Sequence, residues 1–262
     1  MKKRLIGGLL IALITIPCFL LGGIFFDVLV CAVGTLALLE LVNADKDLKK
    51  IPLLIKLIAC VLSLLITLSN VNESLYLGID YNLVAATLLI MGVLAIIFHD
   101  NKFSAEQSFK LSFITIFTGL ISNFYINIFS ENKWFLVYLI AIAVGTDVFA
   151  YVVGKMIGKH KITKISPNKT IEGCVAGTIA GTAAGYLFFI NMFTPQNGIV
   201  LLGITLLLSV IGQLGDLYFS LIKRDNNIKD FSNTIPGHGG ICDRIDSLSF
   251  IVIAFVILLK FV

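Results

Sequence analysis

Long apolar segments follow one another along almost the whole chain, and this feature restricts the possible folds more than any other. A membrane-spanning helix needs about 20 mostly apolar residues, and nine such segments can be drawn. The chain is 58% hydrophobic and 14% charged, whereas soluble domains are about 45–50% apolar and about 25% charged. The sequence therefore predicts an all-α integral membrane protein, a polytopic bundle of about nine transmembrane helices. The predicted spans are 5–21, 24–42, 51–68, 81–98, 109–129, 134–154, 173–193, 199–222 and 245–261.

Lysine and arginine residues are strongly biased towards one set of loops. With a cytoplasmic N-terminus, 17 of the chain's 20 Lys and Arg residues fall in the inner segments 1–4, 43–50, 99–110, 155–172 and 223–244. Short cytoplasmic loops of membrane proteins carry such an excess of positive charge. We therefore predict a multi-pass protein of the plasma membrane, of the bacterial inner-membrane type. Its N-terminus would be cytoplasmic and its C-terminus outside.

Two long polar loops, 155–172 and 223–244, both lie in the second half of the chain. We predict a single polytopic domain over 1–262, in which 131–262 is the catalytic half. The N-terminal helices of 1–130 would form a lipid cavity or a dimer surface, so a homodimer stays an open option. The five cysteines form no CxxC pair, and neither disulfides nor zinc are expected.

Three polar residues share one face near the end of the predicted span 199–222. Asp216, Ser220 and Lys223 are spaced i, i+4 and i+7, which places them on one side of a helix. A carboxylate inside a membrane span is costly to hold, so a functional role is the default expectation for Asp216. The alternative is that Asp216 only pairs with Lys223 or Arg224 inside the bundle.

A glycine-dense turn, Pro-Gly-His-Gly-Gly at 236–240, precedes the last predicted span. Glycines can adopt positive φ and aim backbone N–H groups at an anion. Asp243 and Asp246 follow, three residues apart, and share a face if they are helical. Carboxylates together with substrate phosphates suit Mg²⁺. With the nearby cations Lys223 and Arg244, this favours phosphoryl or nucleotidyl transfer, at the inner membrane surface, to a substrate partly in the membrane.

These residues form a pattern with a known counterpart. It reads Ser220-x-x-Lys223-Arg224, four residues, Lys229-Asp230, then Pro-Gly-His-Gly-Gly-x-x-Asp243-Arg244-x-Asp246. The pattern covers 27 consecutive residues and resembles the signature of the phosphatidate cytidylyltransferase family, the CDP-diacylglycerol synthases. An upstream stretch is similar to a second conserved region of that family. It reads Asp147-x-x-Ala150-Tyr151-x-x-Gly154, then Gly158-Lys159-His160-Lys161, then Ser166-Pro-Asn-Lys169-Thr170-x-Glu172-Gly173.

The resemblance implies that CTP and phosphatidate give CDP-diacylglycerol and pyrophosphate, with Mg²⁺ as cofactor and a second cation as an option. The attacking lipid phosphate oxygen is already anionic, so a strong general base is unnecessary. On this basis we assign Asp216 and Asp243 as metal ligands. The catalytic assignments are Lys223, Arg224, His238 and Asp246, where His238 either stabilises the pyrophosphate or orients the turn. The substrate-binding assignments are Asp147, Ser166, Lys169, Thr170, Ser220, Gly237, Gly239, Gly240 and Arg244.

Two other functions stay open. A CTP-dependent kinase of a polyprenol-type lipid alcohol would need a base for a neutral hydroxyl and would release CDP. A membrane transporter would be expected to show related halves and helices broken at the midplane, whereas the polar residues here gather at one membrane face. The expected partners are CTP, phosphatidate and membrane lipid, without nucleic acid.

Several other charged residues are given no role in the site. Asp27 and Glu40, in the predicted span 24–42, are expected near its outer and inner ends, where they can reach water or cap a helix. Lys155, Lys161 and Lys164 are attributed to topology and to attraction by anionic lipid headgroups.

Overall fold

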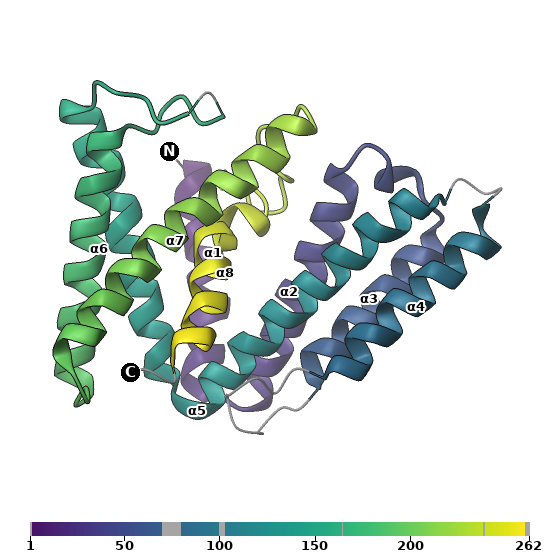
Figure 1. Ribbon diagram of the computed structural model, residues 1–262, viewed down its shortest axis with the longest axis horizontal. Coiled ribbons are helices and arrows are strands. Elements are labelled where there is room, and N and C mark those ends of the chain that lie inside the picture. Colours follow the sequence, from purple (N-terminus) through teal and green to yellow (C-terminus); the bar gives the residue numbers. More distant parts are fainter. Residues whose placement is uncertain (1, 70–79, 100–102, 164, 238, 260–262) are drawn as a thin grey trace. The chain divides into compact units, whose positions relative to one another are not determined.

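The computed structural model describes residues 2–69, 80–99, 103–163, 165–237 and 239–259. Regular structure in these ranges is helical, and pairing of extended backbone is limited to isolated bridges (Figure 1). The elements are α1 (Lys2–Leu21), α2 (Ile24–Ala44), η1 (Leu48–Lys50), α3 (Leu53–Leu68), α4 (Tyr81–Ile97), α5 (Ala105–Ile157), α6 (Ile171–Met192), α7 (Gly198–Asp225) and α8 (Cys242–Leu258). The prediction of an all-α fold is confirmed.

The helices follow the predicted spans closely, with one informative difference. The predicted spans 109–129 and 134–154 both lie within α5, which is 53 residues long. Asn132 interrupts this helix with an extended backbone, φ −161° and ψ 115°. Its side-chain oxygen accepts a hydrogen bond from the Trp134 amide at 3.0 Å. A side chain that accepts from the amide two residues on is typical of a helix N-cap, so a second helical segment begins after Asn132.

Four of the described helices, α2, α5, α6 and α7, are long and apolar enough to cross a membrane. Three apolar stretches are shorter: Gly7–Leu21, Leu53–Leu68 and Tyr81–Ile97. Large apolar side chains also cover the outside of the helices; Ile96 and Ile199, for example, are about 80% exposed. Since water would not tolerate so much exposed apolar surface, these are the helices of a membrane protein.

The chain divides into two compact units. Unit 1 comprises Met1–Ser130 and Asn226–Arg244, and unit 2 comprises Glu131–Asp225 and Ile245–Val262. In unit 1, α2 packs on α1 and α3, and α3 packs on α4. A core of completely buried apolar side chains, among them Leu38, Ile55 and Met91, joins these helices to the first part of α5.

Unit 2 is held together by a row of glycines on α6. Gly173, Gly177, Gly181 and Gly185 recur every fourth residue, so they lie along one helical face. Each faces backbone or side-chain atoms of the second half of α5; a Cβ added to Gly177 would lie 2.6 Å from the Thr146 carbonyl oxygen. Small residues at this spacing let membrane helices approach closely. The α6 helix is also paired with α7 (Figure 1).

Candidate active site

Unit 2 brings together charged residues from three helices and one loop. Asp147 lies on the second half of α5, Asp216 on α7, Asp246 near the start of α8, and Lys169 just before α6. The carboxylates of Asp147 and Asp216 both act electrostatically on Asp246. Four sequence predictions therefore meet in one cluster, which we call the acidic cluster.

Lys169 and Asp216 form an ion pair inside the acidic cluster. Their side chains are only 22% and 27% exposed, so the pair is partly shielded from water. The sequence offered Lys223 or Arg224 as alternative partners of Asp216, and the ion pair in the structure joins it to a residue 47 positions earlier. Lys223 acts electrostatically on Asp246. Lys169 and Lys223 thus offset part of the negative charge that the three carboxylates bring together.

The Ser247 hydroxyl donates a hydrogen bond to Asp147, and the Ser247 side chain is buried. The amide of Ser247 also donates to Asp246 at 2.8 Å. Ser220, predicted to share a face with Asp216, is buried and donates to the Asp216 carboxylate at 3.5 Å. Sequence reasoning found Ser220 by its spacing but missed Ser247, because an isolated serine in an apolar span carries no distinguishing pattern.

The acidic cluster has the donor type that a hard divalent cation requires. No three His, Cys, Asp or Glu side chains in the described ranges converge closely enough to hold a metal ion by themselves. Mg²⁺ does not need that many, since it keeps several waters and takes one or two carboxylates together with substrate phosphates. The carboxylates of Asp216 and Asp246 therefore fit Mg²⁺ in kind.

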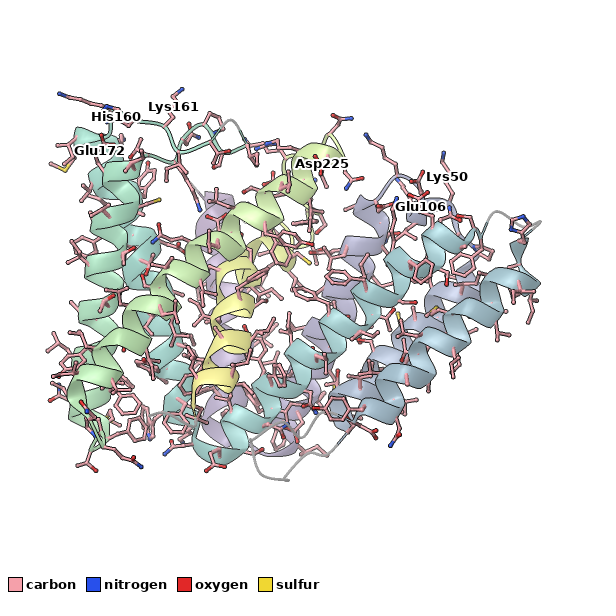
Figure 2. The ribbon with its side chains drawn as sticks, viewed as in Figure 1. Lys50, Glu106, His160, Lys161, Glu172 and Asp225 are labelled. Carbon is pink, nitrogen blue, oxygen red and sulfur yellow. The ribbon has the colours of Figure 1, made fainter. Side chains whose placement is uncertain are left out.

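The loop that carries Lys169 is tied down where it meets α6. Glu172, in the first turn of α6, accepts from the Lys159 amide at 3.2 Å and from the His160 amide at 3.3 Å. It also contacts His160 Nδ1 at 2.6 Å; the same side chains are labelled in Figure 2. His160 is therefore part of the loop's anchor, and Glu172, which the sequence marked as part of the family pattern without a role of its own, is a structural residue.

Two further predicted residues shape the same loop. The Thr170 hydroxyl accepts from the Gly173 amide at 3.2 Å and caps the N-terminus of α6. The Ser166 carbonyl accepts from the Lys169 amide at 3.1 Å and closes a turn. Arg224, at the end of α7, donates from Nε to the Ile165 carbonyl at 3.4 Å. These contacts fix the backbone from which Lys169 reaches Asp216.

The glycine-dense turn belongs to unit 1. Asp243 accepts hydrogen bonds there from the amides of Phe231 at 3.0 Å and of Gly240 at 2.9 Å, both on Oδ2. Gly239 has φ 81°, and a Cβ at this position would lie 2.9 Å from the same oxygen. Glycine is therefore required at 239 for its conformation and for the space. Gly237 also has positive φ, whereas His238 lies outside the described residues.

Asp243 thus closes the turn in unit 1, while Asp216 and Asp246 belong to unit 2. The assignment of Asp243 and Asp216 to one metal stays a prediction. Arg244 is in the first turn of α8, where its amide donates to the Ile241 carbonyl at 2.9 Å.

Glu40 is a buried carboxyl group of unit 1 that accepts four hydrogen bonds, and the sequence predicted no role for it in the site. It is only 7% exposed and accepts from the Ser232 hydroxyl at 2.6 Å and the Thr234 hydroxyl at 3.1 Å. It also accepts from the amides of Ile241 at 3.0 Å and Cys242 at 2.9 Å. Glu40 thus caps another helix, α8. Because α8 is remote from Glu40 in the sequence, the contact could not be predicted from local spacing.

Apolar helices that carry a cluster of carboxylates and lysines define the class as a membrane protein with a charged site among its helices. The sequence profile of the Cytidylyltransferase family matches residues 2–262. Phosphatidate cytidylyltransferase of Bacillus subtilis (strain 168) is 35% identical over 257 residues, covering 96% of this chain and 95% of that protein. Phosphatidate cytidylyltransferase of Staphylococcus aureus (strain COL) is 32% identical over 263 residues, covering 99% of both. The chain belongs to the cytidylyltransferase family and is a nucleotidyl-transferring enzyme.

Proposed function

We propose that this enzyme transfers the cytidylyl group of CTP to phosphatidate and forms CDP-diacylglycerol and pyrophosphate in phospholipid biosynthesis. The observation that carries the proposal is the match over almost the full chain to phosphatidate cytidylyltransferases. The acidic cluster of unit 2 supports it, because its carboxylates and lysines are what a reaction between two polyanions needs.

In the proposed reaction a phosphate oxygen of phosphatidate attacks the α-phosphorus of CTP. The bond between the α-phosphorus and the oxygen that bridges to the β-phosphorus breaks, and pyrophosphate leaves. Both reactants are anionic, so their mutual repulsion is the first barrier. Lys169 and Lys223 lower this barrier by neutralising phosphate charge. When Lys169 leaves Asp216 to bind a phosphate, it exchanges one anionic partner for another. The lipid oxygen is already anionic, so no residue has to remove a proton.

We propose Mg²⁺ as the cofactor, with Asp216 and Asp246 as its holders in unit 2. When bound, Mg²⁺ would neutralise negative charge on the triphosphate. Asp147, hydrogen-bonded to Ser247, would keep the cluster anionic enough to attract the ion. Asp243 stays a predicted ligand, and its two amide bonds hold the adjoining turn in place.

We also propose nine spans with a cytoplasmic N-terminus, an external C-terminus and a site that faces the cytoplasm of the plasma membrane. Within unit 1, Asp47 of the predicted inner segment 43–50 pairs with Lys110, the last residue of the predicted inner segment 99–110, at 3.3 Å. Lys50 and Glu106, from the same two segments, appear at one end of the unit in Figure 2. Within unit 2, the loop before α6 and Asp225 likewise share one end (Figure 2). Protease protection of a C-terminal tag in sealed inverted vesicles tests this orientation, and cleavage there would contradict it.

The deciding experiment incubates the purified enzyme in detergent with phosphatidate, a Mg²⁺ titration and CTP labelled at the α-phosphorus. The proposal expects label in the lipid, one pyrophosphate per turnover and no activity with EDTA. Release of CDP, with label left in the nucleotide, would instead indicate the lipid kinase. A transporter would not turn over CTP without a sealed membrane. The mass of the enzyme in detergent, measured by light scattering in parallel, decides whether it is a monomer or a homodimer.

A further inference from the structure

We propose that Glu40 of α2 is a positioning residue that holds the glycine turn and the start of α8 in the conformation needed for catalysis. The functional half of this inference rests on the proposed function, since it takes the turn to be part of the cytidylyltransferase site. The structural half stands on the contacts of Glu40 alone. The segment that Glu40 holds, 231–242, is called the turn segment below.

The geometry is that of a clamp with four bonds. Oε1 accepts from the hydroxyls of Ser232 and Thr234 and from the amide of Ile241, and Oε2 accepts from the amide of Cys242. The bonds reach both ends of the turn segment, so one buried side chain fixes its entrance and its exit. A second link supports the clamp, because Cys242 Sγ donates to the Ala37 carbonyl at 3.4 Å, one turn before Glu40.

The chemistry of a helix start explains why a carboxyl group is placed there. The first amides of a helix have no partner within the helix, and they carry a partial positive charge. The amide of Cys242, the first residue of α8, is such a group; Cys242 is buried, and its neighbour Ile241 is partly buried. An acidic side chain usually reaches such amides from the preceding residues. Here Glu40 does so from about 200 residues away in the sequence.

The fit between Glu40 and the turn is close. A Cβ added to Gly240 would lie 2.5 Å from Glu40 Oε2, so the turn approaches the carboxyl group with its bare backbone. The amide of the same Gly240 donates to Asp243. Glu40 and Asp243 therefore hold adjacent amides of one short stretch, at residues 240, 241 and 242. Movement of Glu40 would be passed directly to Asp243 and Gly239, both of which we assign to the site.

The test compares Glu40→Gln with Asp27→Asn, which removes a carboxylate from the same helix about 13 residues, or about 20 Å, away. Glu40→Gln keeps the shape of the side chain but turns an amide nitrogen, which cannot accept, towards groups that donate. In the purified full-length enzyme, hydrogen–deuterium exchange of the turn segment should rise at least about tenfold in Glu40→Gln. Its kcat/KM should fall about 10- to 100-fold, as found when groups that orient ligands are lost. Asp27→Asn should change neither quantity.

A double-mutant cycle with Ser232→Ala separates positioning from a general loss of stability. If Ser232 acts through Glu40, Ser232→Ala should raise exchange and lower activity in the wild type but add little in Glu40→Gln. If Glu40→Gln does not fold, the double variant Ser232→Ala with Thr234→Ala is measured in its place. That variant loses the two hydroxyl donors but keeps the hydrogen bonds from the Ile241 and Cys242 amides to Glu40.

Unchanged exchange of the turn segment in folded Glu40→Gln would overturn the clamp. Raised exchange with wild-type kcat/KM would overturn the functional half, because the turn would then be held without serving catalysis. Should the wild type itself fail to convert CTP and phosphatidate, the proposed function falls. The exchange measurement would still decide whether Glu40 holds the turn.

Discussion

The replacement Gly177→Ala tests how closely α6 must pack to build the acidic cluster. The added Cβ would lie 2.6 Å from the Thr146 carbonyl oxygen and 2.9 Å from the Ala150 Cβ. Real Cβ atoms do not approach other atoms so closely, and a backbone carbonyl cannot rotate away. The two helices must therefore move apart. Gly203→Ala on α7 is the matched control, because nothing lies within 4 Å of a Cβ there.

The magnitude follows from two opposing effects. Alanine favours a helix over glycine by about 1 kcal/mol, and both variants gain this term. Overpacking costs about 1–3 kcal/mol, and the upper part of that range applies to Gly177 because the obstructing atom belongs to the backbone. We expect Gly177→Ala to lower the free energy of unfolding by about 2 kcal/mol and Gly203→Ala to raise it by up to about 1 kcal/mol. In a chain of this size, 2 kcal/mol corresponds to about 4–8 °C in Tm.

The assay is thermal unfolding of both variants in one detergent, followed by intrinsic fluorescence, together with CTP turnover at saturating lipid. Asp147 lies next to Thr146 on α5, so a displaced α5–α6 pair should also lower kcat in Gly177→Ala. A Tm of Gly177→Ala equal to or above that of Gly203→Ala would refute the close packing and the reasoning built on it.

Three further predictions concern single side chains. Lys169→Met removes the partner of Asp216; for a pair shielded only in part, the loss is about 2 kcal/mol, so kcat/KM should fall about 30-fold, while Lys161→Met on the same loop stays near wild type. A wild-type value for Lys169→Met would exclude the pair from catalysis. Asp243→Asn should reduce activity at limiting Mg²⁺ at least about tenfold; near-normal turnover there would disprove its assignment as a metal ligand. Thr170→Val removes the α6 cap and should cost about 1 kcal/mol, or about 2–4 °C in Tm, whereas Thr170→Ser should retain the wild-type Tm.

The break within α5 shows how a boundary between helices becomes visible in sequence. The predicted spans 109–129 and 134–154 were separated because polar residues interrupt the apolar run between them. The structure places the break at Asn132, whose side chain caps the segment that follows. Hydropathy located the interruption, but it could not show that one extended residue is enough to separate the two helical segments.

The sequence identified some residues of the site and missed others. Asp216 and Asp147 were found as charges in apolar spans, and Lys169 was found through the family pattern. The resemblance also predicted that Asp147 and the loop of Lys169 complete the site of Asp216, but the ion pair between Lys169 and Asp216 was not predicted. Ser247 was missed for want of a local pattern. Glu40 was noticed as a charge in a span, yet none of its bonding partners lies near it in the sequence.

The sequence by itself determined the helical class, the approximate positions of the helices and the family, because hydropathy depends on residue type and a motif on local spacing. The tertiary structure decided which groups meet. The Lys169–Asp216 pair joins residues 47 positions apart, and the Glu40 clamp joins residues about 200 apart. Such contacts depend on helix packing, which in unit 2 is set by the glycine row of α6 and in unit 1 by the buried core around α2. When helix packing determines which residues make contact, the local sequence around each residue does not predict its partner.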